Sequence, residues 1–564
     1  MLSFRWPALL RRTLLLACLW LLAVVSQAAK AAESCAIASA HPLATRAGCE
    51  VLDRGGTAFD AAIALTAALA VVEPFASGLG GGGFYLLHRA DDGFETFIDA
   101  RETAPARATR EFYVNEDGSA RQRRSLDGAT AAAIPGIPAA IDWLAGRYAS
   151  LPLQATLAAA VRLAREGFAV DARYAWAAGY REALLKGRPD AAHFLDGGKA
   201  PTVGFVLKQP QLAATLERLA REGRDGFYKG EVAERMVAAV RSAGGLWTLQ
   251  DLAGYRVVER EPLRLSFRGM RVITAPLPSS GGLVLAQTLQ ILESLPLETL
   301  SEVQRAHFVV EAWRRGYNDR ARFMGDPDFV RVPVARLASR DYARQRGASI
   351  DPERATPSSA LPPIVEPAEE GNHTTHFSIM DRHGNRVAAT LSINAPFGSG
   401  FVAGDTGVLL NNHMDDFTLS PVAPNLYKLV GNEANAIAPG KRPLSSMSPT
   451  FVEDARGVLV FGTPGGSRII SMVTLGILDY ALNPAFDLAR MLALPRYHHQ
   501  YLPDRVEFEP GGFPAEWVAA LRAKGHAVEA GRRKWGNMQA VYFDKRSGEA
   551  LAEGDPRGKA GVLF

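Results

Sequence analysis

The chain changes character at Thr374-Thr375-His376-Phe377-Ser378, where a proline-rich segment ends and a strand-like run begins. The preceding residues 351–373 carry five prolines, several acidic residues and no apolar periodicity, which is typical of an exposed, poorly ordered connector. Residues 375–380 and 386–393 alternate in polarity or are rich in β-branched side chains, and Gly384 lies in the short segment between them. This pattern predicts a β-hairpin.

The part of the chain before this point is predicted to be mostly helical. Thr57 and Asp60 form a capping pair for a buried helix that ends before Pro74. Apolar periodicity predicts further helices at residues 153–166, 211–223 and 283–293. Strand-like segments follow the hairpin at residues 408–410, 450–452 and 458–461. A helix-rich first part and a strand-rich second part, without short repeats, indicate an α+β layered architecture.

A glycine run at residues 78–83 contains the spacing G-x-G-x-x-G in Gly78, Gly80 and Gly83. A dinucleotide-binding turn follows a strand and opens a helix, whereas this run follows a helix and leads into the strand-like residues 84–88. The sequence therefore predicts close backbone packing here and no nucleotide site.

Residues 1–32 have the features of a signal peptide: basic residues, then an apolar run at 14–25, then small residues. The run is shorter than the about 20 residues of a membrane span, so we expect a periplasmic or secreted protein without a stable membrane anchor. Removal of residues 1–32 leaves 59 basic and 59 acidic residues. A chain without net charge does not favour nucleic-acid binding.

The cysteines that remain after such a cleavage are Cys35 and Cys49. An oxidising compartment permits a disulfide between them, and two buried thiols are the alternative. No metal-binding pattern of the H-E-x-x-H or cysteine-rich type is present, and G-x-S-x-G is absent. His498 and His499 are adjacent in a predicted extended segment, so their side chains would point to opposite faces and serve structural roles. We expect no metal or cofactor.

Thr374 is the candidate nucleophile because of its position. On its own, a threonine at the start of a strand is explained by β-propensity. A cut immediately before it, however, would create a threonine with a free α-amino group. Such an amine has a pKa of about 7.7 to 8.0, against about 10.4 for lysine, and can serve as the general base for the hydroxyl of the same residue.

From about Ala44 to Pro556 the sequence resembles the gamma-glutamyltranspeptidase family. The resemblance rests on the glycine run and on these motifs: Asp99-Ala100-Arg101-Glu102-Thr103-Ala104-Pro105, Thr374-Thr375-His376-Phe377-Ser378, Asn411-Asn412-His413-Met414-Asp415-Asp416-Phe417, Arg442-Pro443-Leu444-Ser445-Ser446-Met447-Ser448-Pro449-Thr450 and Thr463-Pro464-Gly465-Gly466-Ser467-Arg468. It implies the four-layer αββα sandwich of N-terminal-nucleophile hydrolases. It also implies self-cleavage between His373 and Thr374 into a large subunit, residues 33–373, and a small subunit, residues 374–564.

The resemblance assigns catalytic roles to a few residues. Thr374 would be the nucleophile of both self-cleavage and catalysis, and Ser392 and Asn394 would orient it. The backbone amides of Gly465 and Gly466 would form the oxyanion hole. The alternative for the glycine pair is an ordinary turn.

The resemblance also implies a pocket for an α-amino acid group. Arg101, Ser445 and Ser446 would bind the substrate's α-carboxylate, for which a planar guanidinium is well suited. Asp416 and His413 would bind its α-amino group. Without the family match, Arg101 and Asp416 would be surface charges and the two serines a helix cap.

This chain departs from the family pattern at two of the expected site positions, and a third position falls in a loop over the pocket. His413 stands where the family has Gln or Glu, and Ser392 stands where Thr is common. Tyr427 falls where the family has a loop that covers the pocket.

The expected reaction is transfer of a gamma-glutamyl group from glutathione or a related amide to water, an amino acid or a dipeptide. A related acylase that acts on glutaryl or cephalosporin-type amides is the alternative. An inactive binding or scaffold protein is disfavoured because Thr374 is present.

Overall fold

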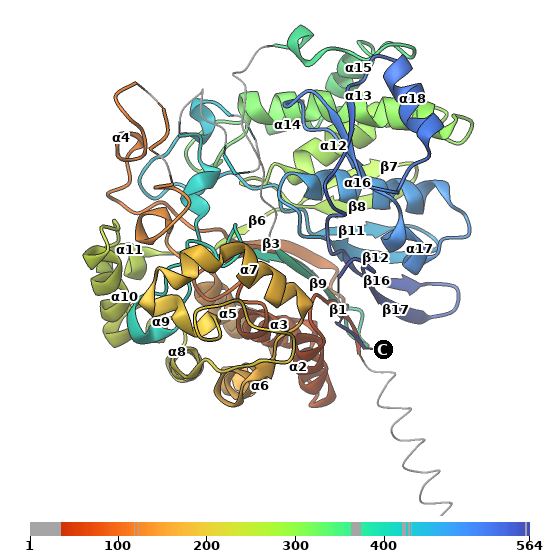
Figure 1. Ribbon diagram of the computed structural model, residues 1–564. Coiled ribbons are helices and arrows are strands. Elements are labelled where there is room, and N and C mark those ends of the chain that lie inside the picture. Colours follow the sequence, from red (N-terminus) through yellow and green to blue (C-terminus); the bar gives the residue numbers. More distant parts are fainter. Residues whose placement is uncertain are drawn as a thin grey trace, which may run out of the picture.

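The computed structural model describes residues 35–117, 119–121, 123–362, 374–419, 425–426, 429, 431–558 and 561–563. The predicted signal peptide, His373 and Tyr427 lie outside the described residues. Two β-sheets are stacked face to face between two layers of helices (Figure 1). Among the described residues, no helix combines the length and the apolar composition that a membrane span requires.

The first sheet is built from both sides of Thr374. Its described strands have the order β18-β1-β9-β10-β2-β3-β6. They span β18 Gly561–Leu563, β1 Ala36–Ser39, β9 Thr375–Met380, β10 Arg386–Ser392, β2 Gly82–Arg89, β3 Phe94–Ala100 and β6 Val258–Arg260. The hairpin β9–β10 lies between β1 and β2 and pairs antiparallel with both. The two predicted subunits therefore share one sheet.

The second sheet faces the first. Its described strands have the order β17-β16-β12-β11-β8-β7 and span β17 Glu549–Gly554, β16 Gln539–Asp544, β12 Gly457–Gly462, β11 Thr450–Glu453, β8 Met270–Thr274 and β7 Leu263–Phe267. Strand β9 packs against β12 and β16. A Cβ at Gly462 would lie 2.3 Å from the ring of His376, so a glycine is needed where the sheets approach each other.

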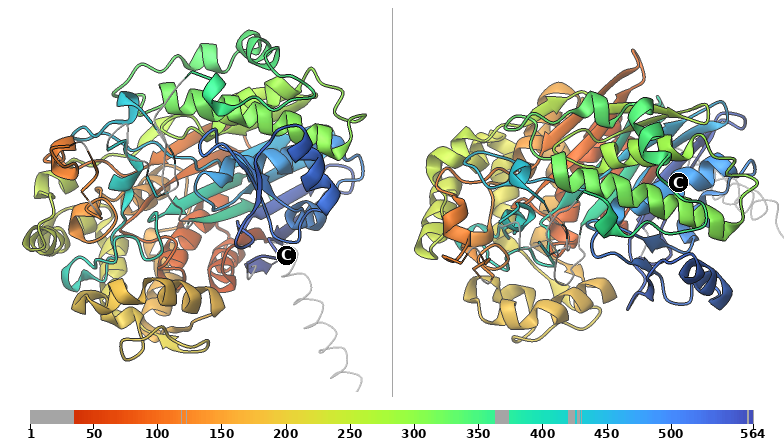
Figure 2. Two further views of the ribbon diagram at one scale, coloured as in Figure 1. Left: turned by 45° about the horizontal axis from the view of Figure 1, so that its top comes forward. Right: turned by 90° about the horizontal axis from the view of Figure 1, so that it is seen from above.

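Helices cover the outer face of each sheet. The first sheet is covered by the group α2 Pro42–Asp53, α3 Ala58–Val72, α5 Ile137–Arg147, α6 Leu153–Glu166 and α8 Pro210–Glu222. Helix α3 is apolar apart from Asp60 and Thr66 and is buried along its whole length. The second sheet is covered by α12 Gly281–Leu292, α13 Glu302–Phe323, α15 Arg340–Gly347 and α16 Arg468–Leu482. In the view from above, α12 and α13 lie over the second sheet (Figure 2).

Smaller elements complete the described structure. The other α-helices are α4 Arg110–Tyr113, α7 Ala172–Lys186, α9 Asp225–Tyr228, α10 Gly230–Ser242, α11 Leu249–Gly254, α14 Val334–Leu337, α17 Leu488–Ala493 and α18 Ala515–Ala523. The remaining strands are β4 Phe168–Ala169, β5 Val206–Leu207, β13 Tyr497–His498, β14 Val506–Phe508 and β15 Val528–Ala530.

Most of the predicted elements are confirmed. The hairpin, the predicted helices and the Thr57–Asp60 capping box are all present. The prediction of a strand at residues 408–410 is wrong, because Leu409 and Leu410 form only isolated bridges, with Val402 and Gly80. The glycine run packs closely as expected: a Cβ at Gly80 or Gly81 would lie 2.1 Å or 2.3 Å from a neighbouring carbonyl oxygen.

Residues 351–362 are mostly exposed, as predicted for a connector, but the expectation of poor order is wrong, because Ala355, Ser358 and Leu361 are buried and anchor the segment. Ser358 is buried there, and its hydroxyl accepts a hydrogen bond from Nη1 of Arg314 at 2.7 Å and donates one to the carbonyl of Tyr501 at 2.6 Å. The carbonyl of Pro362 accepts from Nδ2 of Asn318 at 3.0 Å. Polar side chains and backbone groups hold this segment against the rest of the protein. Such contacts leave no apolar periodicity in the sequence. Residues 363–373 lie outside the described residues.

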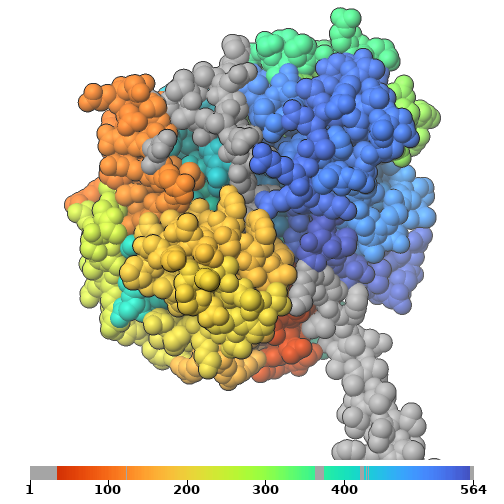
Figure 3. Space-filling model, viewed as in Figure 1, coloured from red at the N-terminus to blue at the C-terminus, as the bar shows by residue number. Residues whose placement is uncertain are grey.

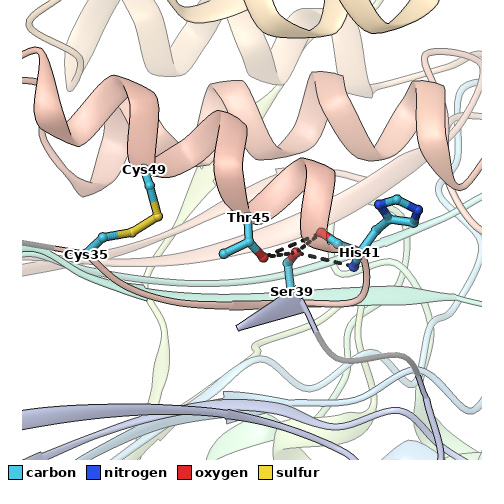
Figure 4. The surroundings of a disulfide bond; sticks show 5 residues. All are labelled: Cys35, Ser39, His41, Thr45 and Cys49. Atoms are coloured by element: carbon cyan, nitrogen blue, oxygen red, sulfur yellow. Dashed lines mark hydrogen bonds between the residues drawn. A yellow bond between two sulfur atoms is a disulfide. The ribbon is translucent and has the colours of Figure 1, made fainter. Parts of the chain in front are cut away.

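The cysteines and the histidine pair have structural roles. Cys35 and Cys49 form a disulfide that ties the start of β1 to α2, beside the hydrogen bonds of Ser39, His41 and Thr45 (Figure 4). His498 and His499 are buried and have separate partners, because one bonds to Ser471 and the other to Asp504.

Candidate active site

Thr374 lies directly before β9 and is 4% exposed. It lines two pockets. The first is lined by Arg101, Arg320, Thr374, Ser392, Asn394, His413, Asp416, Leu429, Leu444, Ser445, Ser446, Met447, Gly466, Ser467 and Ile469. The second is lined by Phe75, Ala172, Arg173, Trp176, Thr374, Pro464, Gly465, Arg533, Lys534, Trp535, Gly536, Asn537 and Arg557.

The predicted site residues that the structure describes therefore gather around Thr374. All of them line the first pocket except Gly465, which lines the second. They come from segments that are far apart in sequence. The start of β9, the end of β10, the start of β2 and the end of β3 lie at the same edge of the first sheet.

The hairpin brings the hydroxyl of Ser392 next to that of Thr374. The register pairs Thr375 with Leu391, so the residues before β9 and at the end of β10 lie side by side. The two hydroxyl oxygens are 3.3 Å apart. The Ser392 hydroxyl also accepts a hydrogen bond from the backbone amide of Asn394 at 2.8 Å. Asn394 has φ +75°, a conformation that asparagine tolerates better than most residues, and its Nδ2 donates to the carbonyl of Asn412 at 3.0 Å.

The start of β9 is fixed from the opposite side by Glu73, which follows α3. Oε2 of Glu73 accepts a hydrogen bond from the hydroxyl of Thr375 at 2.7 Å, and Oε1 accepts one from Nη1 of Arg173 at 2.8 Å. Burial raises the pKa of Glu73, and the contacts with Arg173 and Thr375 oppose that rise. These contacts hold the backbone next to Thr374.

Arg101 and Asp416 form a buried ion pair in the first pocket. Arg101 is 1% exposed, and its Nη2 donates to Oδ2 of Asp416. Its Nε donates to the carbonyl of Pro443 at 3.1 Å, and its own carbonyl accepts from the hydroxyl of Tyr255 at 2.8 Å. The guanidinium plane is thus fixed. The pair presents a cation and an anion side by side, which is the arrangement that matches a zwitterionic α-amino acid group.

His413 is oriented by Glu102, a residue whose role the sequence analysis missed. Nδ1 of His413 lies 2.7 Å from Oε1 of Glu102, so it donates to this carboxylate. Nε2 then lies 4.0 Å from Oδ2 of Asp416, towards the ion pair. A Cβ at Gly82 would lie 2.4 Å from Oε2 of Glu102, so the glycine run makes room for this side chain.

Arg320 of α13 is a second cation of the first pocket that the sequence analysis missed. Its Nε donates to the hydroxyl of Ser280 at 2.9 Å. Burial lowers the pKa of Arg320 to about 10, so it is charged at neutral pH. No sequence signal marks this residue, because α13 contains several other arginines.

Ser445 is held by the turn that opens α12. Its backbone amide donates to the carbonyl of Pro278 at 2.9 Å, and its carbonyl accepts from the amide of Ser280 at 2.8 Å. Gly465 and Gly466 follow β12 and have φ values of +152° and +56°. Both values favour glycine, so a side chain at either position would strain the turn beside Thr374.

The sequence model of the gamma-glutamyltranspeptidase family matches residues 44–564. The chain belongs to this family. It is 41% identical to the glutathione hydrolase proenzyme of Escherichia coli K12 over 529 residues, which cover 92% of this chain and 90% of the relative.

Solved structures of related proteins agree with this family assignment. A cephalosporin acylase from Bacillus halodurans superposes with a TM-score of 0.82 at 29% identity and covers 94% of this chain and 96% of its own. A chain of the Helicobacter pylori gamma-glutamyltranspeptidase has a TM-score of 0.56 at 37% identity and covers 58% of this chain and 94% of its own. The fold is thus the αββα sandwich of N-terminal-nucleophile hydrolases, as the resemblance implied.

Proposed function

We propose that this protein is a self-processed gamma-glutamyltransferase and glutathione hydrolase that uses Thr374 as its nucleophile. The observation that carries the proposal is that Thr374 and the Arg101–Asp416 ion pair line the same pocket. A reactive hydroxyl and a charge pair for an α-amino acid are the two features that transfer of a gamma-glutamyl group requires.

Processing comes first. The Thr374 hydroxyl attacks the carbonyl of His373, the acyl group moves from nitrogen to oxygen, and water cleaves the resulting ester. The products are a large subunit that ends at His373 and a small subunit that begins at Thr374. The sharing of one sheet by strands from both parts supports the expectation that the two chains stay together after the cut.

The free α-amine of Thr374 then acts as general base. It takes the hydroxyl proton while Oγ1 attacks the gamma-carbonyl of the donor. The amides of Gly465 and Gly466 stabilise the oxyanion, a type of contact that contributes about 3 to 4 kcal/mol per donor. The C–N bond breaks, and the leaving amine takes the proton. Water or an acceptor amine next attacks the ester, the C–O bond breaks, and Thr374 regains its proton.

Donor selection depends on the charge pair. Arg101, with Ser445 and Ser446, binds the α-carboxylate, and Asp416 with Nε2 of His413 binds the α-amino group. A glutaryl group has the same chain length and carboxylate and lacks only the amino group. The amino side of the pocket is therefore what separates the proposed activity from the acylase alternative.

The test compares gamma-glutamyl and glutaryl p-nitroanilide on purified, processed protein, together with glutathione and a dipeptide acceptor. We expect kcat/KM to be at least about tenfold higher for the gamma-glutamyl compound, since one charge-assisted contact is worth about 1.5 to 3 kcal/mol. Equal or better cleavage of the glutaryl compound would favour the acylase.

Residues 1–32 are proposed to direct export to the periplasm or the medium, and Tyr427 to belong to a loop that covers the pocket. Amino-terminal sequencing of protein from the periplasmic fraction tests whether residues 1–32 direct export.

A further inference from the structure

A third pocket lies among the helices that cover the second sheet. Its walls come from the first turns of α13, the second half of α16, the segments around α17 and the segment that leads into α18. Helix α13 contacts α18 and α16 contacts α17, and all four lie on the same side of the molecule (Figure 1). Figure 3 shows the C-terminal segments, in blue, at the surface of this side. The described lining residues, none of which lines the first or the second pocket, are Glu302, Arg305, Ala306, Leu475, Leu478, Asp479, Leu482, Asn483, Ala485, Arg490, Leu494, Pro495, Tyr497, Gly512, Phe513, Pro514 and Trp517.

One wall of the third pocket is aromatic. The rings of Phe513 and Trp517 are stacked, with centroids 4.2 Å apart and an interplanar angle of 28°. The ring of Tyr497 lies 5.8 Å from that of Phe513 and 5.6 Å from that of Trp517. Leucines of α16 add aliphatic surface to the same pocket. A lining of this kind suits a ligand with a flat, apolar body.

Three hydrogen-bond donors of the third pocket have no partner among the described residues: Nη1 of Arg305, the hydroxyl of Tyr497 and Nε1 of Trp517. None of these three atoms is fully buried. The guanidinium of Arg305 is held from one side, because its Nη2 donates to the carbonyl of Leu300 at 3.2 Å. Burial raises the pKa of Tyr497, and the positive charge of Arg305 opposes that rise, so these two side chains lie close together. A ligand in the pocket can therefore accept hydrogen bonds from neighbouring donors.

The charges of the third pocket favour an anion. Arg490 donates two hydrogen bonds to the carboxylate of Asp479, at 2.7 Å and 2.8 Å, so these two charges balance each other. Arg305 forms no ion pair with any residue that the structure describes. It lies near Glu298, but that carboxylate is bonded to another arginine. Glu302 is exposed, so solvent screens its charge. The charge of Arg305 is therefore available to a ligand.

We propose that the third pocket is a binding site for a small aryl carboxylate. The rings of the ligand lie against Phe513 and Trp517, and its carboxylate accepts hydrogen bonds from Nη1 of Arg305 and from the hydroxyl of Tyr497. A cationic ligand is disfavoured, because the carboxylate of Asp479 is already paired. The inference does not rest on the proposed function, since this pocket shares no lining residue with the two pockets around Thr374.

The test measures binding of two probes, 2-naphthoate and 2-naphthamide, to the purified protein by equilibrium dialysis. The probes share the same rings and differ in charge. We expect 2-naphthoate to bind to one site per chain with a Kd of about 1 mM or lower, about tenfold more tightly than the amide. In Arg305→Gln the ratio of the two Kd values should fall to about one. The matched control is Arg331→Gln, which removes an exposed charge from outside the pocket lining and should change the ratio by less than about twofold.

Absence of saturable binding, or a tenfold ratio that persists in Arg305→Gln, would overturn the proposal. Tyr497→Phe provides the same readout if Arg305→Gln fails to fold, because it keeps the ring and removes one donor. Its ratio should fall about threefold or more, and an unchanged ratio would count equally against the site. The result is independent of the gamma-glutamyltransferase activity, because the measurement contains no donor and follows no reaction.

Discussion

Nδ1 of His413 lies 2.7 Å from Oε1 of Glu102, and both side chains are buried. The hydrogen bond satisfies a carboxylate that also lies 3.5 Å from Nη1 of Arg101. It turns Nε2 of His413 towards Asp416. His413 thus lies between Asp416 and Glu102, the residue that follows Arg101 in the sequence.

Replacement of His413 by Ala should lower the free energy of unfolding by about 1 to 3 kcal/mol, because Glu102 would lose a donor inside the protein. His413→Gln should recover part of this loss, since its amide can donate to the same carboxylate. Denaturant unfolding measures the free energy of unfolding of both variants. His383→Ala, at an exposed turn position, is the control. Equal stability of His413→Ala and the unmodified protein would mean that the hydrogen bond contributes nothing.

Arg101→Ala should reduce kcat/KM for a gamma-glutamyl anilide about 10- to 100-fold more than for the 4-aminobutyryl anilide, which lacks the α-carboxylate. The ion pair with Asp416 is buried, so the loss of Arg101 also costs stability. Arg101→Lys keeps the charge without the planar fork and should show an intermediate selectivity. A parallel loss on both anilides would assign Arg101 a role in folding alone.

Asp416→Asn removes the negative charge of the Arg101–Asp416 ion pair. It should lower kcat/KM for the gamma-glutamyl anilide and leave kcat/KM for the glutaryl anilide unchanged, because the glutaryl group has no α-amino group. We expect the ratio of the two values to fall about tenfold or more. An unchanged ratio would remove Asp416 from recognition of the amino group.

Stability should fall in acid partly through His526. Its Nδ1 accepts a hydrogen bond from Nη2 of Arg314 at 3.5 Å, and its Nε2 shares a hydrogen bond with Nδ1 of His307 at 2.8 Å. Burial, followed by the positive neighbours His307 and Arg314, lowers the pKa of His526 to about 3. In the unfolded chain the value is about 6.5. The unfolded state therefore binds the proton first, and this contribution is complete above about pH 6.5 and is lost as the pH falls towards 3.

His526→Gln should make the pH dependence of unfolding shallower between pH 6 and 4, by up to about 1.4 kcal/mol per pH unit. Urea unfolding at several pH values measures the slope. Identical slopes in the two proteins would show that His526 titrates normally in the fold.

The sequence predicted the hairpin and the helices well, because local signals such as the Thr57–Asp60 capping box and the Gly384 turn determine them. It predicted the site residues only through the family resemblance. Arg320 and Glu102 could not be predicted as site residues, because their positions in the site depend on contacts with segments that are distant in the sequence. The packing of residues 351–362 could not be predicted, because the backbone and polar contacts that hold this segment leave no apolar pattern in the sequence.

The proposed function depends first on self-cleavage of the chain immediately before Thr374. Intact mass and amino-terminal sequencing of the purified protein test it, with Thr374→Ala as the variant and Thr375→Ser, which keeps the hydroxyl bonded to Glu73, as the matched control. We expect two chains in the unmodified protein and in Thr375→Ser, with the smaller chain beginning at residue 374, and one uncut chain in Thr374→Ala. A small chain with another start, or a Thr374→Ala protein that splits into the same two pieces, would contradict it.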